Sequence, residues 1–283
     1  MDFELDGAQA AVLARVDAAL AQGPEDELFE RLRSAGLAAL NPLAATLAAE
    51  RLSRAGAVTP FAVHALVLPL LFETDPGGVA AIAGTRGEGP VAFGAQANLL
   101  IRFEGDTAAA YRCDPARGTA TQANYIYPLG RAVPEGQAIG RAPAAAVRRR
   151  MRLALAAEAV GALDAALAMT ASYLTGREQF GRPLGAFQAL QHRAAELAVR
   201  VEGARWLTRT AAWSDQDEDA ALAAAHATRA ARRMAWEAHQ LHGARGFTDA
   251  YGLGRHTLRL QYLSIAMGGP GAHGGDAGRA RWL

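Results

Sequence analysis

The first quarter of the chain carries apolar residues with the period of a helix. They recur at three- and four-residue spacing in three runs, separated by glycine and proline. The runs are 12–20, 28–32 and 47–52. This pattern predicts short helices that form an N-terminal helical domain over residues 1–73.

The pattern changes at about residue 74. Glycines and prolines become frequent and separate short runs of β-branched and aromatic residues, which favour strands. The runs are 91–93, 99–103 and 125–127. They predict a small middle β domain over residues 74–141.

The helical period returns after residue 142 and persists, most regularly over 190–204 and 227–241. The polar segment Ser214–Asp217 is a break between these two helices. The sequence predicts a C-terminal bundle of long, alanine-rich helices over 142–283. The expected fold class is therefore mainly α with a small β segment.

Composition restricts the function. The 283 residues are 51% hydrophobic and 20% charged, which is typical of a folded protein. A net charge of +1 argues against a nucleic-acid partner. A single cysteine, Cys113, excludes an internal disulfide and a cysteine-based zinc site, so any redox chemistry would need a cofactor. The histidines show no clustered spacing that would predict a metal site.

The distribution of apolar and charged residues also predicts where the protein is located. No uncharged apolar run approaches the roughly 20 residues of a membrane span. The acidic start Met1–Asp6 is unlike a secretion signal. We expect a cytoplasmic protein with no membrane partner.

The segment Tyr173–Gln191 is the first candidate for chemistry. Its glycines and proline end one helix, and Phe187 begins the next, so its simplest interpretation is a turn between helices. It also offers the guanidinium group of Arg177, the amide of Gln188 and a close backbone approach at Gly181. These groups together suit a pyrophosphate.

The segment Gln240–Phe247 is the second candidate. A glycine-rich turn at a helix end is usually only a C-cap. It is not a Rossmann fingerprint, because it follows a helix and not a strand.

Together the two segments resemble the acyl-CoA dehydrogenase family. Tyr173–Gln191 is similar to the family signature Y-x-x-x-R-x-Q-F-G-x-P-L-x-x-F-Q-x-x-Q, and Gln240–Phe247 is similar to its Q-x-x-G-G-x-G-Y/F turn. The resemblance implies a fold of N-terminal helices, a β domain and a C-terminal four-helix bundle. It also implies FAD, whose flavin lies on one chain while its ADP end is held by the two motifs of a neighbouring chain.

The resemblance assigns roles residue by residue. Arg177 would bond the FAD pyrophosphate, and Phe180 and Phe187 would flank the adenosine. Ala244 replaces the second glycine of the family turn, and its methyl group fits only if its φ angle is negative. The cofactor-binding set implied is Arg177, Gln179, Phe180, Gly181, Phe187, Gln188, Gln240, Gly243 and Ala244.

The catalytic base of the family is missing from its two usual positions. Members remove the α-proton of an acyl-CoA with a carboxylate. The commoner position corresponds to Met267 and the alternative one to Met151, and methionine cannot accept a proton. Glu158 and Asp164 lie two or more helical turns beyond Met151. We therefore expect no catalytic residue in this chain.

Two further segments bear on the cofactor and substrate. Glu73–Gly78 replaces the family segment T-E-P-x-A-G-S-D, which holds the flavin ring, so the chain is expected not to hold the ring alone. Arg152 occupies a position that lies near acyl-CoA in active relatives, which makes it the candidate substrate contact. The alternative is that the run Arg148–Arg152 is a solvated basic turn.

This combination resembles the smaller, noncatalytic subunit of heteromeric acyl-CoA dehydrogenases of the steroid side-chain type. The resemblance implies a larger dehydrogenase subunit as partner, a heterotetramer with two copies of each chain, an acyl-CoA substrate from lipid metabolism, and electron-transfer flavoprotein as acceptor. Two alternatives stay open: a homomeric dehydrogenase with an unusual base, and a non-enzymatic scaffold that has lost FAD.

Overall fold

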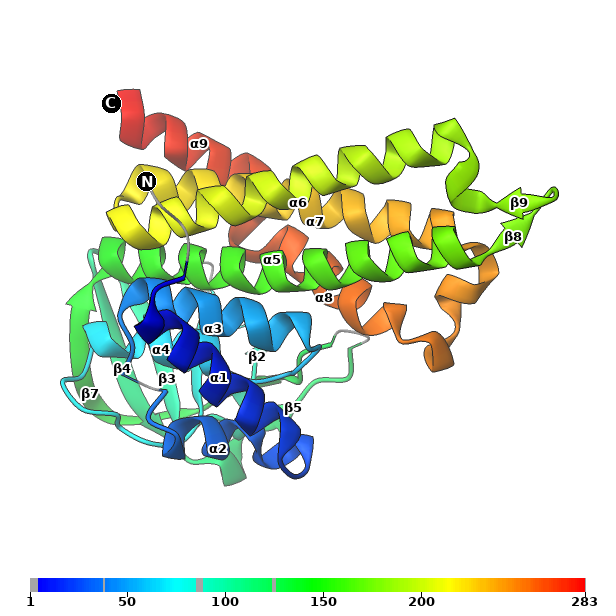
Figure 1. Ribbon diagram of the computed structural model, residues 1–283. Helices are drawn as coiled ribbons and strands as arrows, with labels where there is room; N and C mark the ends of the chain where they lie inside the picture. Colours follow the sequence, from blue (N-terminus) through cyan, green and yellow to red (C-terminus); the bar gives the residue numbers. More distant parts are fainter. Residues whose placement is uncertain (1–4, 38, 85–88, 124–125, 283) are drawn as a thin grey trace.

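The computed structural model describes residues 5–37, 39–84, 89–123 and 126–282. Its elements follow one another as helices, then strands, then long helices (Figure 1). The expected fold class, mainly α with a small β part and a C-terminal helical bundle, is confirmed. Part of the acidic start, Met1–Glu4, and Tyr125 lie outside the described residues.

The N-terminal helices begin where the sequence places capping residues. The side chain of Asp6 accepts a hydrogen bond from the backbone N–H of Gln9, and the Gln9 side chain returns one to the Asp6 backbone. Asn41 caps the third helix in the same way, by accepting from the N–H of Ala44. The helices are α1 Gly7–Ala21, α2 Leu28–Ser34, α3 Pro42–Arg54 and α4 Phe61–Leu66.

The β part consists of two small sheets. The larger has the strand order β1-β3-β4-β7, with β1 parallel to β3 and the other pairs antiparallel, and the smaller has the order β2-β6-β5. The strands are β1 Ala80–Ile82, β2 Val91–Ala92, β3 Leu99–Glu104, β4 Thr107–Cys113, β5 Thr119–Ala120, β6 Leu129–Arg131 and β7 Pro134–Pro143.

The strand predictions were only partly correct. The runs 91–93 and 99–103 form β2 and β3, although Phe93 leaves β2 with a positive φ of 60°. The run 125–127 was wrong as a strand, because its described residues Ile126 and Tyr127 form a bend before β6. The two longest strands, β4 and β7, carry no β-branched run and were missed.

The C-terminal helices form the bundle. The helix α5 lies at its centre and packs against α3 on one side and against α6, α7 and α8 on the others (Figure 1). It is long and apolar enough to cross a membrane, but 72% of its most apolar window is buried in the structure, as in a core helix. The bundle helices are α5 Ala144–Gly176, α6 Gln188–Ser214, α7 Asp217–His242, α8 Leu253–Ile265 and α9 Gly269–Trp282.

The corner between α6 and α7 is fixed by ion pairs to the start of α5. Arg149 bonds Asp215 at 2.8 Å and Asp217 at 2.9 Å, and Arg150 bonds Asp215 at 3.0 Å. The predicted break is therefore confirmed. The interpretation of Arg148–Arg152 as a solvated basic turn is wrong, because the segment is helical and its charges have partners: Arg149 and Arg150 in that corner, Arg152 at Asp276 of α9, and Arg148 over the Phe103 ring.

Candidate functional site

A short hairpin projects from one end of the bundle, between α5 and α6 (Figure 1). It consists of β8 Glu178–Gln179 and β9 Arg182–Pro183, and it is closed by a hydrogen bond from the Leu184 N–H to the Arg177 carbonyl at 2.8 Å. Phe180 at its tip has a positive φ of 56° and is 89% exposed. A strained aromatic residue facing solvent is a sign of function more than of stability.

The hairpin presents groups that can bind an anionic aromatic ligand. Arg177 is exposed and forms no ion pair with any described residue. Among the described residues, the Gln179 amide donates only to the Glu178 carbonyl, at 2.7 Å. The guanidinium carbon of Arg182 lies 4.0 Å from the ring centroid of Phe187, which meets Phe180 edge to face. A cation, amides and aromatic faces are thus available together.

The glycine-rich turn begins where α7 ends. Gly243 has φ 59° and ψ −145°, a conformation that only glycine adopts readily. Ala244 follows it in a 3₁₀ turn and has no positive φ, so its methyl group fits as expected. Below the turn, the His242 ring donates to the Ala238 carbonyl at 2.7 Å and stacks on Tyr173 at 4.6 Å. These contacts hold the turn against α5.

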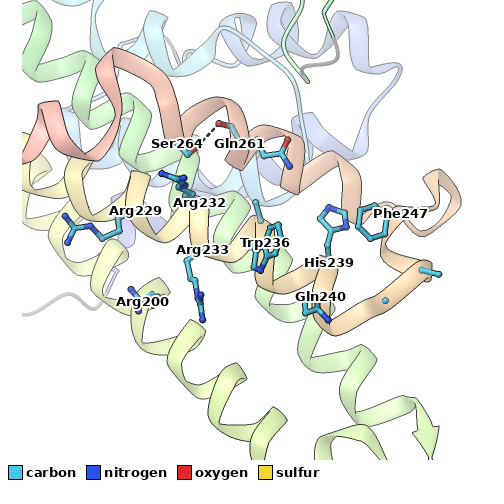
Figure 2. A pocket seen from close by; sticks show the side chains of 13 residues that line it. Arg200, Arg229, Arg232, Arg233, Trp236, His239, Gln240, Phe247, Gln261 and Ser264 are labelled. Atoms are coloured by element: carbon cyan, nitrogen blue, oxygen red, sulfur yellow. Dashed lines mark hydrogen bonds between the residues drawn. The ribbon is translucent and has the colours of Figure 1, made fainter.

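A groove of about 1000 Å³ runs from this turn along α7, between α6 and α8 (Figure 2). Trp236, which is 70% exposed, lies in the middle, and His239 stacks on Phe247 near the turn, with ring centroids 4.5 Å apart. Of the predicted cofactor residues, Gln240, Gly243 and Ala244 line the groove. The hairpin residues do not line it: Arg177, Gln179, Phe180, Gly181, Phe187 and Gln188.

The other half of this groove was not predicted from the sequence. Arg229, Arg232 and Trp236 line it upstream of Gln240, and Arg200 lines it from α6. A signal was present, because 229, 232, 236 and 240 follow one another at three- and four-residue spacing and must share a helix face.

The interior beneath α5 is closed around Glu158. The Tyr127 hydroxyl donates to the Glu158 carboxylate, and Arg259, only 1% exposed, donates to the Ser53 carbonyl at 3.0 Å. The guanidinium carbon of Arg259 also lies 5.6 Å from the Tyr127 ring centroid. Burial raises the pKa of Glu158, and the guanidinium group of Arg259 opposes that rise. The cavity there is about 10 Å³, which leaves no room for an acyl chain.

No described group at the expected base positions can act as a base. Met267 has a positive φ of 52° at the junction of α8 and α9 and packs on the main core. Met151 packs beneath the larger sheet. Asp164 is held between Arg54 at 2.9 Å and Arg205 at 2.7 Å.

The other two predicted segments are engaged within the chain. Arg152, the candidate substrate contact, forms an ion pair with Asp276 of α9. In the segment Glu73–Gly78, Asp75 accepts from Arg33 at 2.8 Å and from the Gly77 N–H at 3.0 Å. Although burial opposes the effect, these two donors hold the pKa of Asp75 below its usual value. The segment expected to hold the flavin ring therefore bonds to the chain itself, whereas Arg177, Gln188 and Gln240, which are expected to hold the ADP end of FAD, are exposed.

The comparisons with known proteins agree with this geometry. Residues 144–276 match the family model described as the acyl-CoA dehydrogenase C-terminal domain. Over 122 residues the chain is 35% identical to the probable acyl-CoA dehydrogenase YngJ of Bacillus subtilis, and over 118 residues it is 36% identical to the acyl-CoA dehydrogenase IpdE2 of Mycolicibacterium smegmatis. These alignments cover 41% and 42% of this chain but only 32% and 38% of those relatives, about a third of their length.

The likeness of the fold extends beyond the matched segment. A chain of the ChsE4-ChsE5 complex from Mycobacterium tuberculosis superposes with a TM-score of 0.81 at 23% identity, covering 99% of this chain and 98% of the other. That likeness shows a shared fold from the N-terminal helices to the bundle. The family match assigns residues 144–276, just under half of the chain, to the acyl-CoA dehydrogenase C-terminal domain.

Proposed function

We propose that this chain is one subunit of an FAD-dependent, heteromeric acyl-CoA dehydrogenase, and that it holds the ADP end of FAD for a larger partner subunit. The reaction is the α,β-dehydrogenation of an acyl-CoA thioester. Bound FAD supplies the acceptor for the hydride that leaves the β-carbon when a carboxylate removes the α-proton. Within this chain the described residues bind and orient, and we assign the proton transfer to the partner.

The single observation that carries this proposal is a contrast within the chain. The residues expected to hold the ADP end of FAD, which we call the clasp, include an exposed arginine without an ion pair among the described residues, whereas the expected base positions hold no base. Arg177 is exposed without an ion pair among the described residues, and Gln240 lines the groove. Both expected base positions hold methionine, Met151 and Met267. Glu158 is bonded to the Tyr127 hydroxyl.

Each residue of the clasp has a proposed role. Arg177 bonds the pyrophosphate through its guanidinium group, and Phe180 and Phe187 flank the adenosine. Gln179, Gly181 and Gln188 complete the hairpin side. Gln240, Gly243 and Ala244 form the opposite side, where a helix end and a glycine allow the backbone to approach the ligand. Arg152 reaches acyl-CoA only if it exchanges its bond to Asp276.

The partner and substrate are proposed from the relatives. ChsE4 and ChsE5 form a complex in Mycobacterium tuberculosis, and we propose a similar assembly here, with two copies of each chain. A bulky acyl-CoA, such as a steroid side-chain thioester, fits this two-chain style by analogy. Electron-transfer flavoprotein as acceptor and a cytoplasmic location complete the proposal.

Flavin absorbance of purified protein tests this proposal. The chain is purified alone and after co-expression with a larger acyl-CoA dehydrogenase subunit from the same source. We expect a visible flavin band only for the co-expressed pair. A yellow chain on its own would support a homomeric enzyme, and a colourless pair would support a scaffold that has lost FAD.

A further inference from the structure

The groove along α7 has a second half that the clasp does not use. Arg229, Arg232 and Arg233 line it from α7 and Arg200 lines it from α6, around the exposed length of α7 (Figure 2). The three arginines of α7 lie 7 to 11 residues before Gln240, which is roughly 10–16 Å along the helix axis. This arginine half is therefore separate from the glycine-rich turn.

Most charges of the arginine half are not paired with a residue that the structure describes. Arg200, Arg229 and Arg232 form no side-chain hydrogen bond or ion pair with any described residue, whereas Arg233 bonds Glu237 at 2.7 Å. Glu237 is buried and also binds Arg193. No carboxylate is among the described residues that line the groove. The surface thus keeps an excess of positive charge beside an exposed apolar ring.

We infer that the arginine half selects a carboxylate-bearing partner chain and rejects a second copy of this chain. This inference rests on the proposed function and names the chemistry by which the heteromer is chosen. In a pair related by a two-fold axis, the same patch faces itself. Such a pair through this groove would bring the arginines of both copies together without a lining carboxylate, and like charges facing each other disfavour association.

The exposed indole of Trp236 shows where the partner makes its apolar contact. It is 70% exposed and lies one turn from Arg232 and Arg233 along α7, in a groove that is mostly apolar elsewhere. An exposed aromatic ring framed by arginines is the composition of an interface hot spot. The partner is therefore expected to present an apolar pocket for this ring with carboxylates around it.

The test combines the charge reversals Arg229→Glu and Arg232→Glu. Both residues are exposed, so the fold should survive the change. The control combines Arg102→Glu with Arg112→Glu on the strands β3 and β4, which changes the net charge equally and lies away from the groove. The dissociation constant for the co-expressed larger subunit is measured at low and high salt, with flavin content measured at saturating partner.

The groove variant should bind the larger subunit about 10- to 100-fold more weakly at low salt, and the difference should shrink at high salt. The control should bind like the unmodified chain. Equal binding by both variants would overturn the inference. So would loss of FAD with retained assembly, because the arginines would then serve the cofactor. Self-association of the unmodified chain at low salt that Trp236→Ala abolishes would overturn it as well.

Failure of this inference is distinct from failure of the proposed function. If the unmodified chain does not bind the larger subunit at all, the proposed function is wrong. If it binds and the groove variant binds equally well, only the charge selection is wrong.

Discussion

The open end of the bundle and the closed interior below α5 use arginine in opposite ways. At the open end, Arg177 and Phe180 face solvent, and Arg177 forms no ion pair with a described residue. In the closed interior, Arg259 donates to the Ser53 and Ala57 carbonyls and Glu158 accepts from the Tyr127 hydroxyl. Buried polar groups need partners for the fold to be stable, whereas free exposed ones can bind a ligand. Under the proposed function, the open end binds the ligand and the interior stabilises the fold.

The largest expected effect comes from emptying the closed interior. Arg259→Leu removes the donor to the carbonyls of Ser53 and Ala57 and leaves Glu158 without its nearby cation. We expect a loss of about 3–5 kcal/mol in the free energy of unfolding, because one member of a buried network is lost. Urea denaturation measures it.

The matched variant at the open end is Arg177→Leu. It should change the free energy of unfolding by less than about 0.5 kcal/mol, since its side chain is exposed. Similar losses for the two variants would erase the distinction between the open end and the interior.

A second buried group predicts how stability depends on pH. Burial lowers the pKa of His64 to about 4, with Asp75 opposing and Arg33 adding to the shift. Its Nε2 accepts from the Ala80 N–H at 2.9 Å, which requires the neutral ring. As pH falls from 6.5 towards 4, the unfolded chain takes up a proton that the folded chain does not, so stability falls.

The size of this loss is about 3 kcal/mol once pH falls below the folded pKa of His64, since each pKa unit is worth about 1.4 kcal/mol. Urea denaturation between pH 7 and 4 measures it. His64→Gln should make the profile shallower but not flat, because burial also lowers the pKa of His256 to about 4. His192→Gln, at an exposed position, should leave the profile unchanged. Parallel profiles for His64→Gln and the unmodified chain would contradict this assignment.

The sequence predicted the helices better than the strands, for physical reasons. Helical periodicity is local, so 190–204 and 227–241 identified α6 and α7 directly. The strand β4 contains Ala108–Ala110, and alanine has no preference for strands. These alanines are fully buried between β3 and β7, so tertiary packing decides their conformation.

The candidate site shows the same limit. Motif spacing predicted the hairpin and the glycine-rich turn, because each is formed by residues that are close together in the sequence. The partners of Arg149, Arg150 and Arg152 lie 65 or more positions away in the chain, and no local pattern shows such pairs. The groove arginines were missed because charged residues on a helix face are usually only solvated.

A smaller effect is expected when the open end loses its main cation. Arg177→Ala should weaken FAD retention in the assembled complex by roughly 1.5–3 kcal/mol, the value of a charge-assisted hydrogen bond to an anion. Arg177→Lys keeps the charge without the planar fork and should retain an intermediate amount. Flavin content per complex after gel filtration is the measurement, and unchanged content in Arg177→Ala would remove this residue from the clasp.

The smallest effect on turnover is expected from removing the carboxylates of this chain, although loss of the base has a large effect in an active dehydrogenase. Glu158→Gln removes a carboxylate but keeps an oxygen that can accept from the Tyr127 hydroxyl. If the partner supplies the base, the turnover of the complex should stay within a few-fold of the unmodified complex, and Asp164→Asn should behave alike. Loss of a true general base costs about 10²–10⁴-fold. Met267→Glu should likewise create no activity in the isolated chain, because a carboxylate there has no flavin ring beside it. A hundredfold fall in turnover for Glu158→Gln, with assembly and flavin content intact, would mean that the closed interior opens during catalysis and that this chain carries the base.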